Sequence, residues 1–266
     1  MSILLKRILV YGRVYFQLRM SRVKMYKRDF VFMSISNIAF LLGSILFWYL
    51  VTNVGFAVEG WTFSKLLVYV AYSELFYGFH QNIFGIASSY WKAIYTGFFD
   101  VQICRPMDTR FRLIFLNADF GGIVFSFIKF LVILAVSKES FGIVPLLISI
   151  AVVFWASLTF ALIQFIFSYM AFWLHKVEAI VEISENLTLF NKYPLDIFPL
   201  VLRSIVTVIF PFYFFSTFPA KVVLEKYAVT QIVMGVILLI ANLIFWFILN
   251  KIVFQRGRMR YESIQG

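Results

Sequence analysis

Six apolar runs, each about the length of one membrane crossing, recur along the 266-residue chain. The hydrocarbon core of a bilayer is about 30 Å thick, so a crossing helix needs about 20 predominantly apolar residues. Residues 142–174 are too many for one upright crossing and too few for two, so we expect one helix that projects beyond the bilayer. The predicted crossings are residues 30–52, 66–88, 117–137, 142–174, 197–218 and 229–250.

The composition excludes the other common classes of protein. Hydrophobic residues make up 62% of the chain and charged residues 14%, against about 45 to 50% and about 25% in soluble domains. Disorder requires low hydrophobicity. A disulfide scaffold is excluded because Cys104 is the single cysteine. We therefore expect an all-α integral membrane protein with six transmembrane helices in one unit, 30–250.

The net charge of +11 reflects membrane topology rather than nucleic-acid binding, because the basic residues flank the apolar runs. Lys and Arg are retained in cytoplasmic loops. Eighteen of them lie before the first run, in 89–116, in 175–196 and after the last run, whereas four lie in the opposite loops. The bias predicts a multi-pass protein of the cell's inner (plasma) membrane with both termini in the cytoplasm.

The cytoplasmic segments have distinct patterns. Residues 1–29 alternate apolar and basic side chains, which predicts an amphipathic helix lying in the inner interface, in contact with anionic lipids. Residues 251–266 form a basic cytoplasmic tail. The inner segments 89–116 and 175–196 mix apolar and charged positions, so we expect them to form short helices.

The sequence lacks the motifs of an intramembrane enzyme. It contains no H-E-x-x-H, no metal-spaced Cys or His cluster and no G-x-S-x-G, and its histidines are His80 and His175 alone. No G-x-x-x-x-G-K-[ST] loop exists either, so this chain does not bind ATP in the P-loop manner. We expect no catalytic residue and no metal or cofactor on this chain.

Two charges inside the predicted membrane region match in depth. With a rise of about 1.5 Å per residue, Glu74 and Lys129 both lie about 12 Å from the outer edge. Charges at such depth are either paired or functional, so we expect an ion pair between two antiparallel helices. Gln81 continues the face of Glu74 together with Tyr77 and Gly78, and this stripe either lines a polar path or packs closely against a neighbour.

The fifth run carries further polar and irregular features. Arg203 is predicted near the inner edge, where it would extend to the cytoplasmic headgroups. Prolines and aromatic residues near the end of this run predict either a broken or re-entrant outer segment buried against protein, or an aromatic belt at the headgroups. The residues that define this outer segment are Pro211, Phe215, Phe218 and Pro219.

Four short sequences accompany this architecture: YKRDF at 26–30, RPMD at 105–108, YPLDIFP at 193–199 and FPA at 218–220. Together with six spans, a basic helix before the first span and a long inner segment between spans 2 and 3, they resemble the type-2 ABC exporter (ABC-2) permeases. The similarity is to a bacterial subgroup often encoded as two different permeases with one ATPase.

The resemblance implies a mechanism. Two six-span permeases would form the pathway at their interface, and a cytoplasmic coupling helix in 89–116 would dock into ATPase subunits that bind ATP and Mg. The outer segment would shape a gate. Aromatic and Arg side chains dominate such interfaces. The expected contacts are Asp100, Arg105, Asp108 and Arg110 as polar groups, with Trp91, Phe98, Phe99 and Phe111 as apolar anchors.

These inferences predict the permease subunit of an ATP-driven exporter, paired with a second permease that is identical or different. Alternatives remain: a membrane scaffold without transport, or a gradient-driven secondary transporter, whose expected internal symmetry is not evident. The basic residues of 89–116 would then only enforce topology. The many Phe residues suit an amphipathic or lipid-like cargo, or simply a lipid environment.

Overall fold

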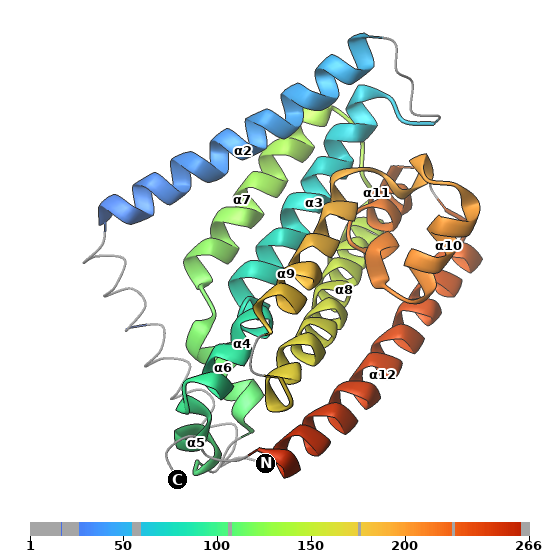
Figure 1. Ribbon diagram of the computed structural model, residues 1–266. Helices are drawn as coiled ribbons and strands as arrows, with labels where there is room; N and C mark the ends of the chain where they lie inside the picture. The colour runs from blue at the N-terminus through green and yellow to red at the C-terminus, as the bar shows by residue number, and fades with distance from the viewer. Residues whose placement is uncertain are drawn as a thin grey trace, which may run out of the picture.

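The computed structural model describes residues 17, 27–54, 60–105, 108–174, 177–224 and 227–261. In these residues all regular structure is helical (Figure 1), which confirms the predicted all-α class. Most of the predicted amphipathic segment 1–29 and residues 262–266 lie outside the described residues. The α-helices are α2 (Lys27–Asn53), α3 (Phe63–Phe84), α4 (Ile86–Tyr95), α5 (Phe98–Ile103), α6 (Thr109–Asn117), α7 (Phe120–Ser137), α8 (Ile143–Tyr169), α9 (Glu178–Asn186), α10 (Leu200–Val208), α11 (Thr217–Leu224) and α12 (Val229–Arg260). The 3-10 helices are η1 (Met170–Phe172), η2 (Leu187–Lys192), η3 (Leu195–Ile197) and η4 (Pro211–Phe214).

Four helices among the described residues are long and apolar enough to cross a membrane: 34–53, 120–137, 143–172 and 229–260. They fall on four of the six predicted runs. The second run forms α3, whose 22 residues would extend about 33 Å. Its Ser, Glu, His and Gln side chains lower its hydropathy, and α3 packs against α2, α7 and α8, so much of its surface is shielded by protein.

The predicted fifth crossing, 197–218, is wrong as a single helix. It is divided among η3, α10, η4 and the start of α11. Pro211 begins η4 after Phe210, whose backbone is extended, because a proline cannot continue a helix without losing a hydrogen bond and clashing with the preceding turn. The break expected near these prolines is therefore present, but Pro219 lies inside the first turn of α11.

A different segment runs beside α3. The hydroxyl of Tyr77 donates to the backbone oxygen of Thr188 (3.1 Å), and that of Tyr69 to the backbone oxygen of Asn191 (3.0 Å). The indole of Trp61, just before α3, donates to Asp196 (3.0 Å). Residues 188–196 thus lie antiparallel to α3 and end beside its first turn.

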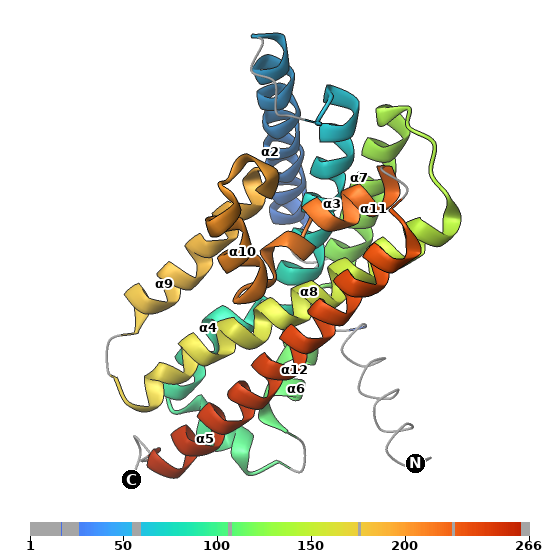
Figure 2. The same cartoon turned by 90° about the vertical axis from the view of Figure 1, so that its right-hand side faces the viewer.

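This arrangement corrects the predicted placement of 175–196 on one inner side. The segment begins near the end of α8 and finishes at the opposite end of α3, which we call the Trp61 end. Hydrogen bonds from hydroxyl groups of α3 to backbone carbonyls of this segment hold the segment in place. Such bonds cannot be predicted from hydropathy. Figure 2 shows α10 and α11 on the same half of the bundle, far from α5.

Helices α4, α5 and α6 form the other end of the molecule, which we call the α5 end (Figure 1). The short helices predicted in 89–116 are therefore present. Tyr90 and Phe99 pack there with Phe172 and Phe254 in a small aromatic core, separate from the main core. The main core includes Phe76 stacked on Phe215, with ring centroids 3.7 Å apart.

Helices α3 and α7 approach closely because two glycines lie at their contact. A Cβ added to Gly78 would lie 2.4 Å from Cβ of Ser126, and one added to Gly122 would lie 2.0 Å from Oδ1 of Asn82. Small residues allow this kind of close helix packing in membranes. Because the two helices lie so close, side chains of α3 and α7 contact one another along their length.

We expect Gly78→Ala to lower the free energy of unfolding by about 1 to 3 kcal/mol, because the added methyl group overpacks the α3–α7 contact. Gly43→Ala on α2 is the matched control, since nothing lies within 4 Å of its added Cβ. Thermal unfolding of the purified protein in detergent measures both. Equal stability of the two variants would contradict the close α3–α7 contact.

Candidate functional site

A polar groove lies between α2, α3 and α7, with a cavity volume of about 910 Å³. Two adjacent rows of α3, each spaced four residues apart, form its floor, because such positions share one helix face. From Tyr69 to Asn82 the rows extend about 20 Å along the helix axis. The α3 residues that line the groove are Tyr69, Val70, Ser73, Glu74, Tyr77, Gly78, Gln81 and Asn82.

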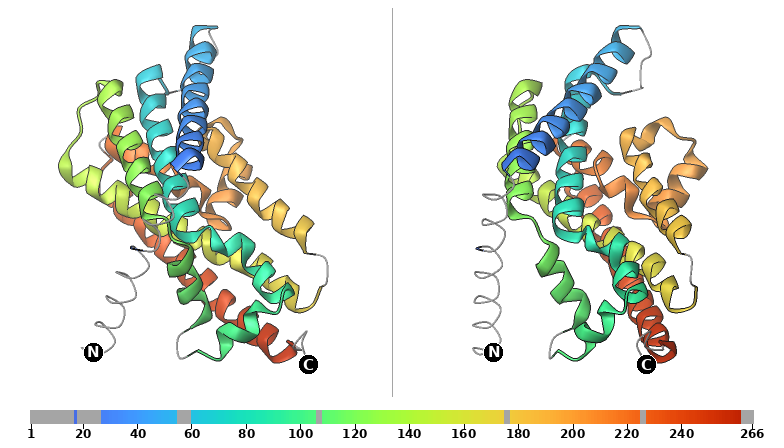
Figure 3. Two further views of the ribbon diagram at one scale, coloured as in Figure 1. Left: turned by 90° about the vertical axis from the view of Figure 1, so that its left-hand side faces the viewer. Right: turned by 60° about the vertical axis from the view of Figure 1, so that its left-hand side comes forward.

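The other walls add hydroxyl, amide and aromatic side chains. From α2 come Ser34, Ser36, Asn37 and Ser44. Asn191 and Lys192 of η2 close one end. Figure 3 shows α2 extending over only the half of the bundle nearest the Trp61 end. The α2 contribution was not predicted, although polar residues recur within the first apolar run of the sequence.

The predicted ion pair is present: the Nζ atom of Lys129 on α7 contacts a carboxylate oxygen of Glu74 on α3. The two side chains are 11% and 16% exposed, respectively. The ring of Phe125 lies 5.6 Å from the same ammonium group. Both charges face the groove, so the pair is set among polar groups inside the helical bundle.

The side chains that continue the face of Glu74 line the groove, and one of them also packs closely against α7. Tyr77, Gly78 and Gln81 all line the groove, and Gly78 also packs against Ser126. Gln81 is exposed, so its amide is free to meet a solute. At the far end of the groove Asp119 caps α7, accepting hydrogen bonds from the backbone N–H groups of Gly121 and Gly122.

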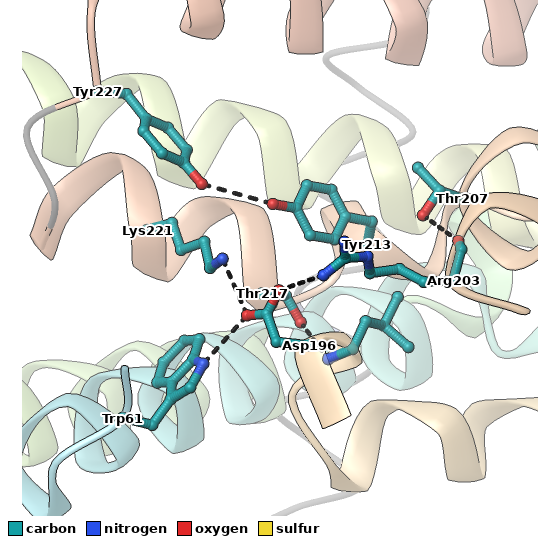
Figure 4. A network of polar contacts seen from close by, with 9 residues as sticks. Trp61, Asp196, Arg203, Thr207, Tyr213, Thr217, Lys221 and Tyr227 are labelled. Atoms are coloured by element: carbon teal, nitrogen blue, oxygen red, sulfur yellow. Dashed lines mark hydrogen bonds and ion pairs between the residues drawn. The ribbon is translucent and has the colours of Figure 1, made fainter. Parts of the chain in front are cut away.

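A second polar cluster lies at the Trp61 end (Figure 4). Asp196 forms ion pairs with Arg203 (3.1 Å) and Lys221 (2.9 Å), and it accepts the hydrogen bond of Trp61. The sequence placed Arg203 and the start of α3 at opposite faces of the membrane, whereas the structure places them at the same end of the bundle, because Asp196 contacts both Arg203 and Trp61. The sequence contained Asp196 within the YPLDIFP segment but gave no sign of its three partners.

The residues that define the outer segment are buried. Pro211, Phe215, Phe218 and Pro219 lie in the protein interior. They pack against neighbouring helices, so these four residues do not form an exposed aromatic belt. Of the two interpretations drawn from the sequence, a broken segment buried against protein agrees with the structure.

The expected docking residues at the α5 end divide into exposed and buried groups. Phe98 and Phe111 are 46% and 59% exposed, and Arg105 is exposed as well. Phe99 is fully buried in the aromatic core, so its predicted role as a docking anchor is wrong. Adjacent helical residues point in directions about 100° apart, which separates Phe98 from Phe99. Trp91 and Asp100 are half-buried.

Arg110 ties the segment to α12 instead of projecting outward. It pairs with Asp108 (2.7 Å), donates to the side-chain oxygen of Asn250 (3.1 Å), and stacks on the Phe254 ring at 4.6 Å. Burial alone would raise the pKa of Asp108, but the hydrogen bonds and charge of Arg110 outweigh it and hold that pKa below its ordinary value. Asp108 therefore stays ionised at neutral pH and also caps α6.

No group of three His, Cys, Asp or Glu side chains within the described part of the chain could hold a metal ion.

A family model described as "ABC-2 family transporter protein" matches residues 38–265. The match includes nearly all of the groove, the Asp196 cluster and the α5 end. No curated protein and no solved structure matches the chain.

We expect Lys129→Ala to destabilise the protein by about 3 to 5 kcal/mol, because it leaves Glu74 buried without its partner. The double variant with Glu74→Ala should lose less than Lys129→Ala alone, because no uncompensated charge remains. Detergent thermal unfolding of the two single variants and the double variant completes the cycle. Losses that simply add would show that the two residues are not coupled.

Proposed function

Because the chain belongs to the ABC-2 transporter family, and is thus an integral membrane permease component of an ABC transporter, we propose that it forms an export pathway with a second permease, identical or different. ATP hydrolysis on separate subunits, which hold ATP and Mg, drives the transport. The observation that carries this proposal is the polar groove along α3.

The groove is unsuited to lipid contact. Polar groups left without partners in hydrocarbon cost several kcal/mol each. Intramembrane charges such as Glu74 and Lys129 usually face a bundle interior or a water-filled cavity. A second permease facing this side would enclose the groove and shield the Glu74–Lys129 pair and the exposed Gln81 from lipid. This supports a pathway between two subunits.

The proposed topology has six crossings formed by α2, α3, α7, α8, the α9–η2 segment and α12. The α9–η2 segment has 9 and 6 residues, which extend about 26 Å at ordinary helical rises. Glu182 and Glu185 are exposed on it, so this crossing also needs a watery neighbour. Helices α10 and α11 then form a re-entrant segment at the Trp61 end.

The α5 end is proposed as the cytoplasmic side and as the ATPase docking site. Among the described residues, more Lys and Arg side chains lie toward this end than toward the Trp61 end, as expected of a cytoplasmic side. Phe98, Phe111 and Arg105 offer exposed aromatic and cationic side chains, the types that dominate protein interfaces. Phe99 and Tyr90 connect the same helices to the ends of α8 and α12, so docking forces would reach the long helices.

Combined Phe98→Ala and Phe111→Ala substitutions should weaken binding of the ATPase subunit at least about tenfold, since interface anchors commonly contribute 2 kcal/mol or more. Phe245→Ala on α12 is the matched control, because this residue is 58% exposed away from the α5 end. Co-purification and titration with the ATPase measure the effect. Unchanged binding and unchanged stimulated hydrolysis would refute docking at this surface.

A cysteine at Gln81 should react with a membrane-impermeant maleimide in vesicles severalfold faster than one at Leu131, because thiolates form in water rather than in lipid. The exposed Cys104 is first replaced by Ser. Leu131 on α7 does not line the groove but is 57% exposed, so surface exposure alone predicts rapid labelling there. Equal rates would contradict a water-accessible groove.

A further inference from the structure

We propose that the Asp196 cluster is a binding site for a single phosphate group, carried either by a phospholipid headgroup or by free phosphate. The site lies at the Trp61 end, outside the polar groove, and it does not depend on the proposed transport function. Its basis is an excess of positive charge and of hydrogen-bond donors around a cavity.

The charges of the cluster do not balance. Asp196 is the one carboxylate within ion-pair distance of Arg203 and Lys221 among the described residues. Figure 4 shows the two cations reaching this carboxylate from different sides. Two cations against one anion leave a net charge of +1, which suits a monoanionic ligand.

Donor groups are also in excess. A guanidinium group has five N–H donors and an ammonium group has three. Arg203 uses NH1 for Asp196, and Lys221 uses Nζ for the same carboxylate. Their other side-chain N–H groups have no protein partner in the described part of the chain. The two side chains remain 35% and 17% exposed, so a ligand can reach them.

The surplus donors border a cavity of about 350 Å³. Ser204, Thr207 and Tyr213 add hydroxyl groups to its wall. A planar guanidinium group matches the oxygen pairs of phosphate, and a neighbouring lysine adds a point charge. A phosphate group is smaller than this cavity.

The carboxylate gives this proposal a distinctive test. Asp196 holds the two cations in place and at the same time repels an anion. Asp196→Asn keeps one of the two acceptor oxygens of this side chain and removes its negative charge, so it should tighten phosphate binding severalfold. Arg203→Gln should weaken the same binding at least about tenfold, as expected for the loss of a charged hydrogen bond. A purely structural cluster predicts that both substitutions act in the same direction.

The experiment titrates the full chain, purified in a neutral detergent, and follows binding by native mass spectrometry. The probes are dihexanoyl-phosphatidylglycerol, inorganic phosphate and dihexanoylglycerol, which lacks the phosphate. Arg203→Lys keeps the ion pair and the fold, and its affinity should fall between those of the native protein and Arg203→Gln. Arg256→Gln, an exposed cation at the opposite end of α12, controls for net charge.

Binding of the phospholipid alone would assign the site to a lipid headgroup, and comparable binding of inorganic phosphate would assign it to the free anion. Either result supports the proposal when the two substitutions act in opposite directions. Equal binding by the native protein and Arg203→Gln, or weaker binding by Asp196→Asn, would overturn it. Binding of dihexanoylglycerol as strong as that of the phospholipid would overturn it as well.

Discussion

A helix that carries many polar side chains inside a packed bundle must find hydrogen-bonding partners for them, and α3 is the helix on which this requirement falls. On one side, Tyr69, Ser73 and Tyr77 donate to backbone oxygens of η2 and its neighbours. Those carbonyls belong to a 3-10 helix, whose hydrogen bonds have poorer geometry than those of an α-helix. The hydroxyl groups of α3 and the carbonyl groups of η2 are therefore hydrogen-bond partners of each other. These bonds hold the segment that follows α8 alongside α3.

The same requirement explains the two ends of the molecule. At the Trp61 end, Asp196 of η3 joins the parts of the broken segment by ion pairs with Arg203 of α10 and Lys221 of α11. At the α5 end, Arg110 is accommodated by Asp108, Asn250 and the Phe254 ring. Each end thus has one central charged side chain that connects segments distant in the sequence.

How far the sequence predicted the site depended on whether its signal was local. The Glu74–Lys129 pair could be predicted because depth along two antiparallel helices follows from counting residues. The division of the fifth run into several short helices could not be predicted in this way, because a buried core rich in Phe has the same hydropathy as a membrane span. The sequence also could not show which of Phe98 and Phe99 is exposed and which is buried. Neighbours in a short helix differ in direction by a rotation about its axis, and tertiary packing decides which direction faces the core.

The sequence by itself determined the class of protein, the runs that became α2, α7, α8 and α12, and the family, because length, hydropathy and short motifs are properties of the chain alone. The tertiary structure decided which polar groups meet. It placed Asp196 beside Trp61, turned Phe99 inward, and brought the hydroxyl groups of α2 to the groove. The physical reason is that hydrogen bonds and ion pairs act over about 3 Å between distant segments, and no local pattern encodes which segments approach so closely.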